Sequence, residues 1–259
     1  MWEGFPWTAA ENTAASGRQL QFTYQFTDNN NTDVKNSHSE ALDVYRGYDD
    51  GYLYGVARAI KSYGKPVLFR LNNEMNTDWT SYSASATMLD PDIFIDNWIR
   101  LYKIFEDEGV DNAIWIFNPN GMDCPQAKWA SFHSYMPPAQ YVQMLGITGY
   151  VTGHSGFPSF EQVYSELEEN YEPFFGDWPW IISEFACGTG DQTKIKEQTQ
   201  WVNDMFDCLA SGRFPNIKGA VWFSGNDYKN DGTISNEFQL NFNNSALMKA
   251  FRDGLARTH

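Results

Sequence analysis

Cysteine is scarce in this chain of 259 residues, which contains only Cys124, Cys187 and Cys208. Three cysteines make no disulfide framework for a domain of this size, and their spacing with the four histidines is not that of a zinc site. The sequence also has no run of about 18 apolar residues, which excludes a membrane-spanning helix. We therefore expect no metal, no cofactor and no membrane partner.

Positive charge is scarce as well. The chain has 18 Lys and Arg against 33 Asp and Glu, which gives a formal net charge of −15. Such a surface repels phosphates, so a nucleic-acid partner is excluded. The first residues, MWEGFPW, contain no basic segment followed by an apolar run, so no signal peptide is visible. This leaves either a cytosolic protein or a fragment whose targeting segment lies outside this chain.

Aromatic side chains, by contrast, are abundant: they make up 17% of a chain that is 42% hydrophobic. A chain of this length and composition can bury the core of one large domain or two small ones. Aromatic faces also stack on sugar rings, although packing in the core is the commoner use of such side chains. Composition alone therefore only favours a carbohydrate ligand.

Apolar runs of strand length alternate with amphipathic helical patterns about six times, without a linker. A polar loop, Asp28–Ser39, follows the first run. The expected strands are Leu20–Thr27, Pro66–Leu71, Ala113–Phe117, Tyr141–Thr148, Trp180–Ser183 and Ala220–Phe223. The expected helices begin near Asp49, at Pro91 after the N-cap Asp90, after the N-cap Ser159, at Lys194, and at Asn244 or Ser245.

This alternation predicts parallel strands with helices outside, in either an open doubly wound sheet or a closed barrel. The nucleotide-binding motifs GxGxxG and GxxxxGK(S/T) are absent, and polar residues follow the strand ends, where a (β/α)8 TIM barrel places its active site. Six units are two short of eight. Either residues 1–19 contain a divergent strand, or the N-terminal part of a longer barrel is missing from this chain. We favour the second alternative, because 19 residues cannot hold two strand–helix units, and we expect a single α/β domain over residues 1–259.

Two carboxylates occur in matching positions. Glu74 follows the apolar run and amides of PVLFRLNN, and Glu184 follows the apolar run of WPWIIS. A barrel places the ends of these two strands across its mouth from each other. Paired carboxylates in this arrangement suit glycoside hydrolysis, in which one protonates the leaving oxygen and the other attacks the anomeric carbon or activates water. For either Glu alone, an exposed loop carboxylate is the competing interpretation.

The chain resembles glycoside hydrolase family 26, within the large clan of retaining (β/α)8 glycosidases. The resemblance runs from about Leu20 to the C-terminus, and it implies that the visible strands are the third to the eighth of the barrel. The blocks for Glu74 and Glu184 are fairly specific as a pair, and the others support them. The matching blocks are GKPVLFRLNNEMNTDW for strand four, IWIFNPN for strand five, YVQMLGITGY for strand six, WIISEFA for strand seven and VWFS for strand eight.

The resemblance implies that Glu74 is the general acid/base and Glu184 the nucleophile of a retaining mechanism, with carboxyl groups about 5–5.5 Å apart. It implies further that Tyr150 forms a hydrogen bond with Glu184. Trp79 and Trp222 would be sugar-stacking platforms, with core packing as the competing interpretation.

Arg70 is expected to point either into the barrel or towards Glu184.

Two departures from the family bear on the substrate. Family mannanases usually have His before the acid/base, whereas this chain has Asn73, and Thr148 stands where many have Asp. In the wider clan Asn at the first position contacts the sugar 2-hydroxyl, which is axial in mannose and equatorial in glucose.

We therefore expect a retaining endo-β-glycanase that hydrolyses a neutral β-1,4-linked polysaccharide, with β-mannan as the first candidate. The alternatives are a β-1,3-1,4-glucanase or xylanase of the same fold, motivated by Asn73, and a non-catalytic carbohydrate-binding barrel, motivated by the missing strands. We expect a monomer, and a secreted full-length parent.

Overall fold

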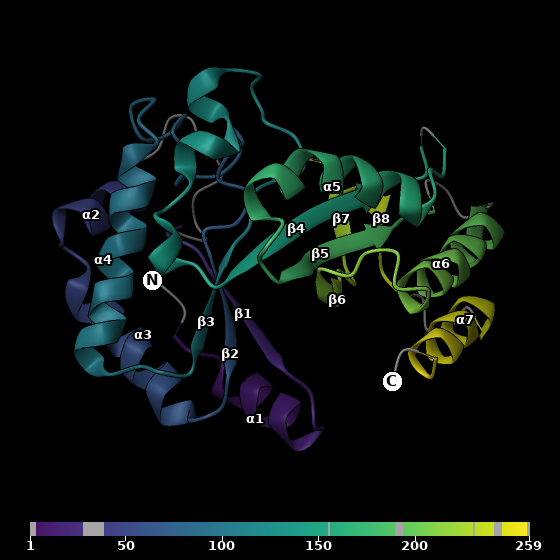
Figure 1. Ribbon diagram of the computed structural model, residues 1–259, viewed down its shortest axis with the longest axis horizontal. Coiled ribbons are helices and arrows are strands. Elements are labelled where there is room, and N and C mark those ends of the chain that lie inside the picture. Colours follow the sequence, from purple (N-terminus) through teal and green to yellow (C-terminus); the bar gives the residue numbers. More distant parts are fainter. Residues whose placement is uncertain are drawn as a thin grey trace. The chain divides into compact units, whose positions relative to one another are not determined.

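The computed structural model describes residues 4–27, 39–154, 156–189, 194–229, 231–240 and 245–257 (Figure 1). Of the predicted polar loop, 28–38 lies outside these ranges. The chain divides into two compact units, Met1–Gly146 and Ile147–His259. Their boundary falls inside a strand, so no linker separates them in the sequence. The expectation of a single domain stays a prediction.

The described residues contain one sheet of six strands, ordered β1-β2-β3-β4-β5-β6. The pairs β1–β2, β2–β3, β3–β4 and β5–β6 are parallel. Strands adjacent in the sheet are therefore also consecutive in the chain, as in a (β/α)8 barrel, and the predicted fold class is confirmed. The bounds are β1 Leu20–Tyr24, β2 Val67–Leu71, β3 Ala113–Phe117, β4 Met144–Val151, β5 Trp180–Cys187 and β6 Ile217–Trp222.

Helices separate these strands along the chain. Three 3-10 turns, η1 Lys128–Ala130, η2 Phe132–Tyr135 and η3 Ala139–Tyr141, lie between β3 and β4, and an antiparallel hairpin, β7 Asn226–Tyr228 with β8 Ile234–Glu237, follows β6. The helices are α1 Trp7–Ala15, α2 Glu40–Arg46, α3 Asp50–Tyr63, α4 Asp92–Glu108, α5 Phe160–Phe175, α6 Ile195–Ala210 and α7 Ser245–Leu255. None of the described helices is long and apolar enough to cross a membrane.

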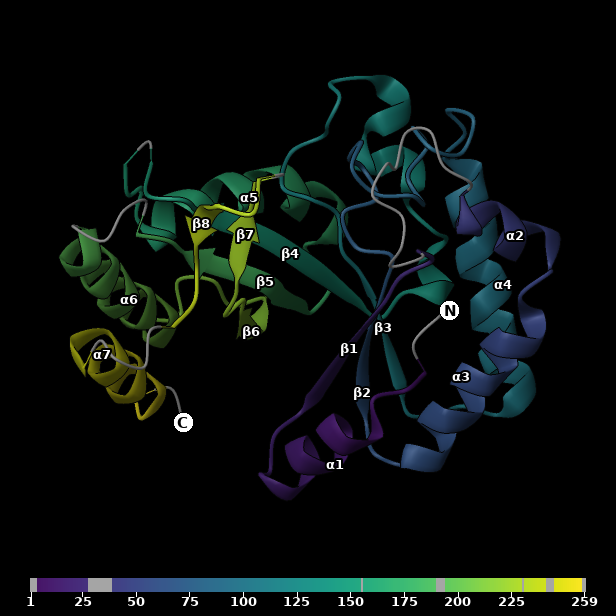
Figure 2. The same cartoon turned by 180° about the vertical axis from the view of Figure 1, so that it is seen from behind.

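Residues 4–19, the described part of the unassigned N-terminal segment, hold no strand. They contain the helix α1, which lies beside β1 (Figure 2). Only Ala10 of this helix is buried, so the segment lacks the apolar stripe by which a helix is recognised in a sequence. The alternative of a divergent strand in this segment is therefore wrong for the described residues.

The start of α4 differs by one residue from the prediction. The helix begins at Asp92, Pro91 occupies the N-cap position, and Asp90 Oδ1 accepts a 3.0 Å hydrogen bond from Asp92 N. Asp90 thus still caps the first turn, although one residue further out than predicted. The helix ends at Glu108 and is capped by Gly109, whose φ of 67° is left-handed and favours glycine.

The core of the first unit is aromatic. Phe69 of β2 packs against Phe105 of α4 and Trp115 of β3, with ring centroids 5.1 and 4.8 Å apart. Trp98 of α4 is fully buried against the same Trp115. Helices α2, α3 and α4 lie together along one side of β1–β3 (Figure 1). This packing identifies the face of the sheet that the helices cover.

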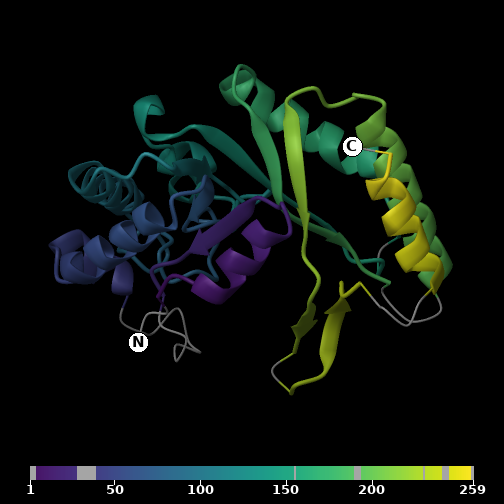
Figure 3. The same cartoon turned by 90° about the horizontal axis from the view of Figure 1, so that it is seen from below.

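The core of the second unit joins β5 and β6 to α6 and α7, which lie side by side (Figure 3). Phe206 of α6 meets Phe251 of α7 with ring centroids 5.4 Å apart. Trp201 of α6 lies 6.5 Å from Phe185 of β5, again between ring centroids. Phe185 of β5 is therefore buried in this core, whereas every residue of β6 is at least partly exposed.

Candidate active site

The turn after β2 positions Glu74. Two non-glycine residues in it, Asn72 (φ 45°) and Glu74 (φ 58°), are left-handed. That conformation costs on the order of 1–2 kcal/mol per residue and persists only where neighbours hold it. Asn72 Oδ1 accepts a 2.8 Å hydrogen bond from Phe26 N, and Glu74 N donates one of 2.8 Å to Asn118 O. The backbone under Glu74 is thus fixed from the ends of two neighbouring strands.

Both carboxylate oxygens of Glu74 accept hydrogen bonds within the first unit. Trp79 Nε1 donates to Oε2 at 3.2 Å, and Asn120 Nδ2 donates to Oε1 at 3.0 Å. The Glu74 side chain is half-buried, whereas Trp79 is 49% exposed. The carboxyl group is therefore oriented by two donors and bordered by an accessible indole ring.

Asn120 is itself held in place by hydrogen bonds from the buried side chain of Asn76. Asn76, with no exposed surface, accepts from Asn120 N at 2.7 Å and donates to Asn120 O at 3.0 Å. Its Nδ2 also donates to Asp123 Oδ1 at 2.9 Å. The sequence-based site omitted Asn120 and Asn76. The signal available for Asn120 was the NPN motif directly after the β3 run, because amide residues, Asn72 and Asn73, also follow β2 directly.

Asn73 is held by a second polar network. Its Oδ1 accepts a 2.8 Å hydrogen bond from Gln25 Nε2, and its backbone oxygen accepts one of 2.7 Å from the Tyr82 hydroxyl. Gln25 Nε2 also donates to that hydroxyl at 2.9 Å. The side chain of Asn73 is buried, at 5% exposure. Its conformation is therefore set by the first unit before any ligand binds.

Arg70 lies on the face of β2 that the helices do not cover. Side chains alternate along a strand, and its neighbour Phe69 packs on α4. Arg70 is 3% exposed. This placement agrees with the first of the two expected orientations, into the barrel.

Glu184 lies within β5, and the strand continues past it to Cys187 instead of ending at Ser183 as predicted. The strand extends further because its pairing with β6 continues to Phe185. The Tyr150 hydroxyl donates a 2.6 Å hydrogen bond to Glu184 Oε1, the contact that the resemblance implied. The Tyr150 ring lies 4.9 Å from the Phe238 ring, between centroids.

Trp222 is half-buried and packs against the helices of the second unit. Its ring lies 5.4 Å from Phe185, 6.2 Å from Trp201 of α6 and 5.7 Å from Phe251 of α7, between centroids. Its Nε1 donates to Phe238 O at 3.0 Å. Contacts with both helices favour the core interpretation of Trp222 over a sugar platform. Thr148, the other position flagged by comparison with mannanases, is buried in β4 at 3% exposure.

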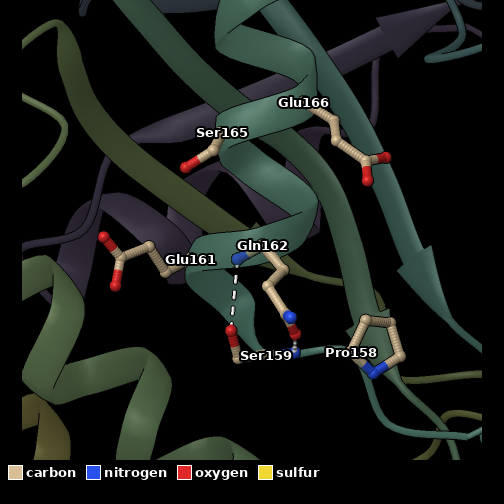
Figure 4. A pocket seen from close by; sticks show the side chains of 6 residues that line it. All are labelled: Pro158, Ser159, Glu161, Gln162, Ser165 and Glu166. Carbon is tan, nitrogen blue, oxygen red and sulfur yellow. Dashed lines mark hydrogen bonds between the residues drawn. The ribbon is translucent and has the colours of Figure 1, made fainter.

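A surface hollow of about 490 Å³ lies elsewhere, at the start of α5 (Figure 4). There Ser159 and Gln162 form a capping box, with reciprocal hydrogen bonds of 2.7 and 3.2 Å. Glu161 and Glu166 also line it, and none of the predicted site residues does. This hollow is an ordinary capped helix end. Across the described ranges, no group of three or more His, Cys, Asp or Glu is placed to hold a metal ion.

The six strands lie in the sheet in chain order, with helices or 3-10 turns between them, and Glu74 and Glu184 lie directly after β2 and in the C-terminal half of β5. This arrangement is that of the (β/α)8-barrel glycosidases. The sequence profile of glycosyl hydrolase family 26 matches residues 10–173, and the chain belongs to this family.

Relatives of known name agree with this assignment. The chain is 26% identical over 232 residues to endoglucanase H of Acetivibrio thermocellus, covering 86% of this chain and 24% of that protein. It is 25% identical over 111 residues to mannan endo-1,4-beta-mannosidase of Bacillus subtilis, covering 41% and 29%. The chain thus spans about a quarter of the length of these curated relatives.

The fold is similar to that of the catalytic domain of the family 26 endo-beta-1,4-mannanase from Bacillus sp. JAMB-750. The TM-score is 0.66 at 14% identity, over 96% of this chain and 68% of that one. At this identity the likeness shows the fold alone.

Proposed function

We propose that the chain is the catalytic part of a retaining endo-β-glycanase, with Glu74 as general acid/base and Glu184 as nucleophile. One observation carries the proposal: in a family 26 chain, Glu74 follows β2, Glu184 lies in the C-terminal half of β5, and each carboxylate is oriented by hydrogen-bond donors of its own unit. A solvated loop carboxylate would need no such donors.

In the first step of the proposed reaction, a Glu184 oxygen attacks the anomeric carbon while Glu74 gives its proton to the departing glycosidic oxygen. This forms a covalent glycosyl ester on Glu184. In the second step Glu74 takes a proton from water, and the resulting nucleophile displaces Glu184 and restores the original configuration. The chemistry requires the two carboxyl groups to be about 5–5.5 Å apart when substrate is bound.

The contacts around each carboxylate suit its proposed role. Trp79 and Asn120 orient the Glu74 carboxyl group, so that proton transfer needs little rearrangement. The Tyr150 hydroxyl donates a hydrogen bond to Oε1 of Glu184. Attack on the sugar is then assigned to Oε2, which fixes the direction of bond formation.

The substrate we propose is a neutral β-1,4-linked polysaccharide, with β-mannan first, bound by a monomeric and secreted parent. The names of the two curated relatives support an endo-acting enzyme and include both an endoglucanase and a mannanase. Since Asn73 Oδ1 accepts from Gln25, we assign contact with the sugar 2-hydroxyl to the Asn73 amide nitrogen. The same residue motivates the second candidate, a β-1,3-1,4-glucanase or xylanase.

The test is release of reducing ends from mannan, mixed-linkage glucan and xylan by the wild type, by Glu184→Ala and by Glu166→Ala. Glu166 is an exposed glutamate of α5 and serves as the matched control. We expect Glu184→Ala to lose activity, azide to restore it with inverted product, and Glu166→Ala to behave as wild type. Full activity of Glu184→Ala would show that Glu184 is not the nucleophile. Oligosaccharide binding by the wild type without turnover would instead indicate a non-catalytic carbohydrate-binding protein.

A further inference from the structure

Gln25 comes directly after β1, and Asn72 holds the backbone on both sides of it. The N–H of Asn72 donates a 2.8 Å hydrogen bond to Tyr24 O, and Asn72 Oδ1 accepts one of 2.8 Å from Phe26 N. Strands β1 and β2 are parallel and paired up to the last residue of each, so the segments that follow them leave the sheet next to each other. This register brings the side chain of Gln25 to Asn73.

Gln25, Asn73 and Tyr82 form a closed ring of hydrogen bonds whose direction is set by a backbone carbonyl. Asn73 O can only accept, so the Tyr82 hydroxyl, 2.7 Å away, donates its single proton to it. That hydroxyl can then only accept from Gln25, whose Nε2 lies 2.9 Å away. The second proton of Gln25 Nε2 requires another acceptor, and Asn73 supplies Oδ1 at 2.8 Å. The amide of Asn73 is thereby oriented by its own main chain.

The reversed orientation of the Asn73 amide is disfavoured at each step of this ring. Rotating this amide alone would place its nitrogen against Gln25 Nε2, so that two donors face each other. Rotating Gln25 as well would place its oxygen against the Tyr82 hydroxyl, whose proton is already bound to Asn73 O. Asn73 and Tyr82 are 5% and 2% exposed, so the mismatch would lie in a buried region, where an unsatisfied polar group costs free energy.

This orientation leaves the Asn73 amide nitrogen available as a donor. Within the part of the chain that the structure describes, Asn73 Nδ2 donates no hydrogen bond, although it keeps some accessible surface. The residue directly precedes Glu74, the proposed acid/base. A sugar hydroxyl that accepts from this nitrogen keeps its own single proton for a second acceptor, whereas an amide oxygen in the same place would take that proton.

We propose that Gln25 and Tyr82 are positioning residues that fix the polarity of Asn73, so that a donor and not an acceptor faces the sugar hydroxyl. This inference rests on the proposed function, which supplies the sugar. Gln25 is half-buried and Tyr82 is buried, and both act through the Asn73 amide without having to touch the substrate. The polarity of this position is therefore a property of the three residues together.

The experiment compares kcat/KM of two Gln25 variants of the full chain on its preferred polysaccharide. Gln25→Leu removes the donor and leaves the Asn73 amide free to turn, so we expect a loss of about two- to tenfold. Gln25→Glu keeps the shape but replaces the donor by an acceptor, which turns Asn73 Nδ2 away from the substrate. That loss should be larger, about ten- to a hundredfold. A role in packing alone predicts the opposite order, because glutamate has nearly the shape of glutamine and leucine does not.

Two controls separate polarity from charge. In an Asn73→Ala background the two Gln25 variants should have equal kcat/KM, because no amide is left to turn, whereas a direct effect of the new charge on Glu74 would persist. Gln200→Glu makes the same change at an exposed glutamine of α6 and should behave as wild type. Tyr82→Phe is a second test that adds no charge: it should lose about two- to tenfold, and little more when combined with Gln25→Leu.

A spectroscopic measurement tests the orientation without activity. In protein with isotope-labelled asparagine, the NMR signals of the Asn73 side-chain amide are identified by their absence from Asn73→Ala. Their protons should exchange with solvent more slowly in Gln25→Glu, where they bind the new carboxylate, than in wild type. Equal exchange in the two folded proteins, or a greater loss of kcat/KM for Gln25→Leu than for Gln25→Glu, would overturn the positioning role. The expected exchange in a wild type that turns over no polysaccharide would overturn the proposed function and leave the orientation of Asn73 established.

Discussion

Asn120 donates a 3.0 Å hydrogen bond to Glu74 Oε1, and both its backbone N–H and its backbone oxygen are bound by the side chain of Asn76. A buried amide with no exposed surface thus orients the proposed acid/base through one intermediary. The arrangement makes Asn120 a positioning residue for Glu74 and Asn76 a positioning residue for Asn120.

Asn120→Ala should therefore lower kcat/KM on the preferred polysaccharide. A hydrogen bond to a charged group is worth about 1.5–3 kcal/mol, which corresponds to a loss of roughly ten- to a hundredfold. Asn170→Ala, an exposed asparagine of α5, is the matched control and should be neutral. Unchanged kinetics of Asn120→Ala, with substrate-saturation curves like those of the control, would contradict the positioning role.

Glu74→Ala should separate substrates by their leaving groups. Loss of a general acid costs about 10²–10⁴ in rate where the leaving oxygen needs protonation, as in a polysaccharide. An aryl glycoside with an acidic phenol needs no such help, so its first-step rate should change far less. The measurement is the ratio of mutant to wild-type rates on the two substrates, followed by stopped-flow release of the phenol. Equal losses on both substrates would show that Glu74 is not the acid.

Tyr150→Phe keeps the ring against Phe238 and removes only the hydroxyl that meets Glu184. We expect kcat to fall by about ten- to a hundredfold, from loss of one hydrogen bond to a charged group. The melting temperature should change little, because the packing of the ring is retained. Tyr228→Phe removes the hydroxyl of a 63% exposed tyrosine and is the control. A Tyr150→Phe variant with wild-type kcat would exclude this contact from the reaction.

Phe69→Ala should destabilise the first unit. The side chain has no exposed surface and contacts the rings of Phe105 and Trp115. Truncation of a buried phenylalanine costs about 3–5 kcal/mol through lost burial and the cavity left behind. Urea unfolding followed by tryptophan fluorescence measures the change, with the exposed Phe174→Ala as reference. A midpoint equal to that of the reference would show that this cluster does not stabilise the unit.

Alkaline pH should lower the free energy of unfolding through Tyr135. Burial raises the pKa of Tyr135 to about 12, against about 10 for an exposed tyrosine. Below about pH 10 the phenol is neutral in both states, so its contribution does not vary with pH. Between about pH 10 and 12 the unfolded state ionises and the native state does not, and stability is lost at up to about 1.4 kcal/mol per pH unit.

Tyr135→Phe removes the ionisable hydroxyl. Between about pH 10 and 12 the free energy of unfolding of this variant should therefore fall less steeply with pH, as measured by denaturant titrations at each pH. Burial also raises the pKa values of Tyr24 and Tyr164, so part of the slope should remain in the variant. A slope identical in the variant and the wild type would mean that Tyr135 does not contribute to the pH dependence.

The sequence predicted those features that depend on local apolar patterning. The runs before Glu74 and Glu184 identified β2 and β5, and Asp90 with Pro91 identified the start of α4 to within one residue. Element boundaries were less accurate where tertiary contacts decide them. Strand β5 extends through Glu184 because it continues to pair with β6, and α1 was not predicted because its only buried residue is Ala10.

Which partners a side chain near the end of a strand contacts could be learned only from the tertiary structure. The pairing of β5 with β6 contains register shifts. At each shift the side chains no longer alternate between the two faces of the sheet, so a sequence pattern cannot tell which face a residue occupies. Trp222 and Phe223 are adjacent aromatic residues in the sequence, and only their partners distinguish them: Trp201 and Phe251 for one, Tyr150 for the other.

By itself, the sequence determined the order of the six sheet strands and of the helices α3 to α7, and it named Glu74 and Glu184 as candidates, because these follow from periodicity and from residue type. The tertiary structure alone decided that Asn76 holds Asn120, that Asn120 holds Glu74, and that Trp222 packs against α6 and α7. Asn76 and Asn120 are 44 positions apart. Here the parallel strands β2 and β3 bring the segments that follow them to the same edge of the sheet, and this makes the pairing possible.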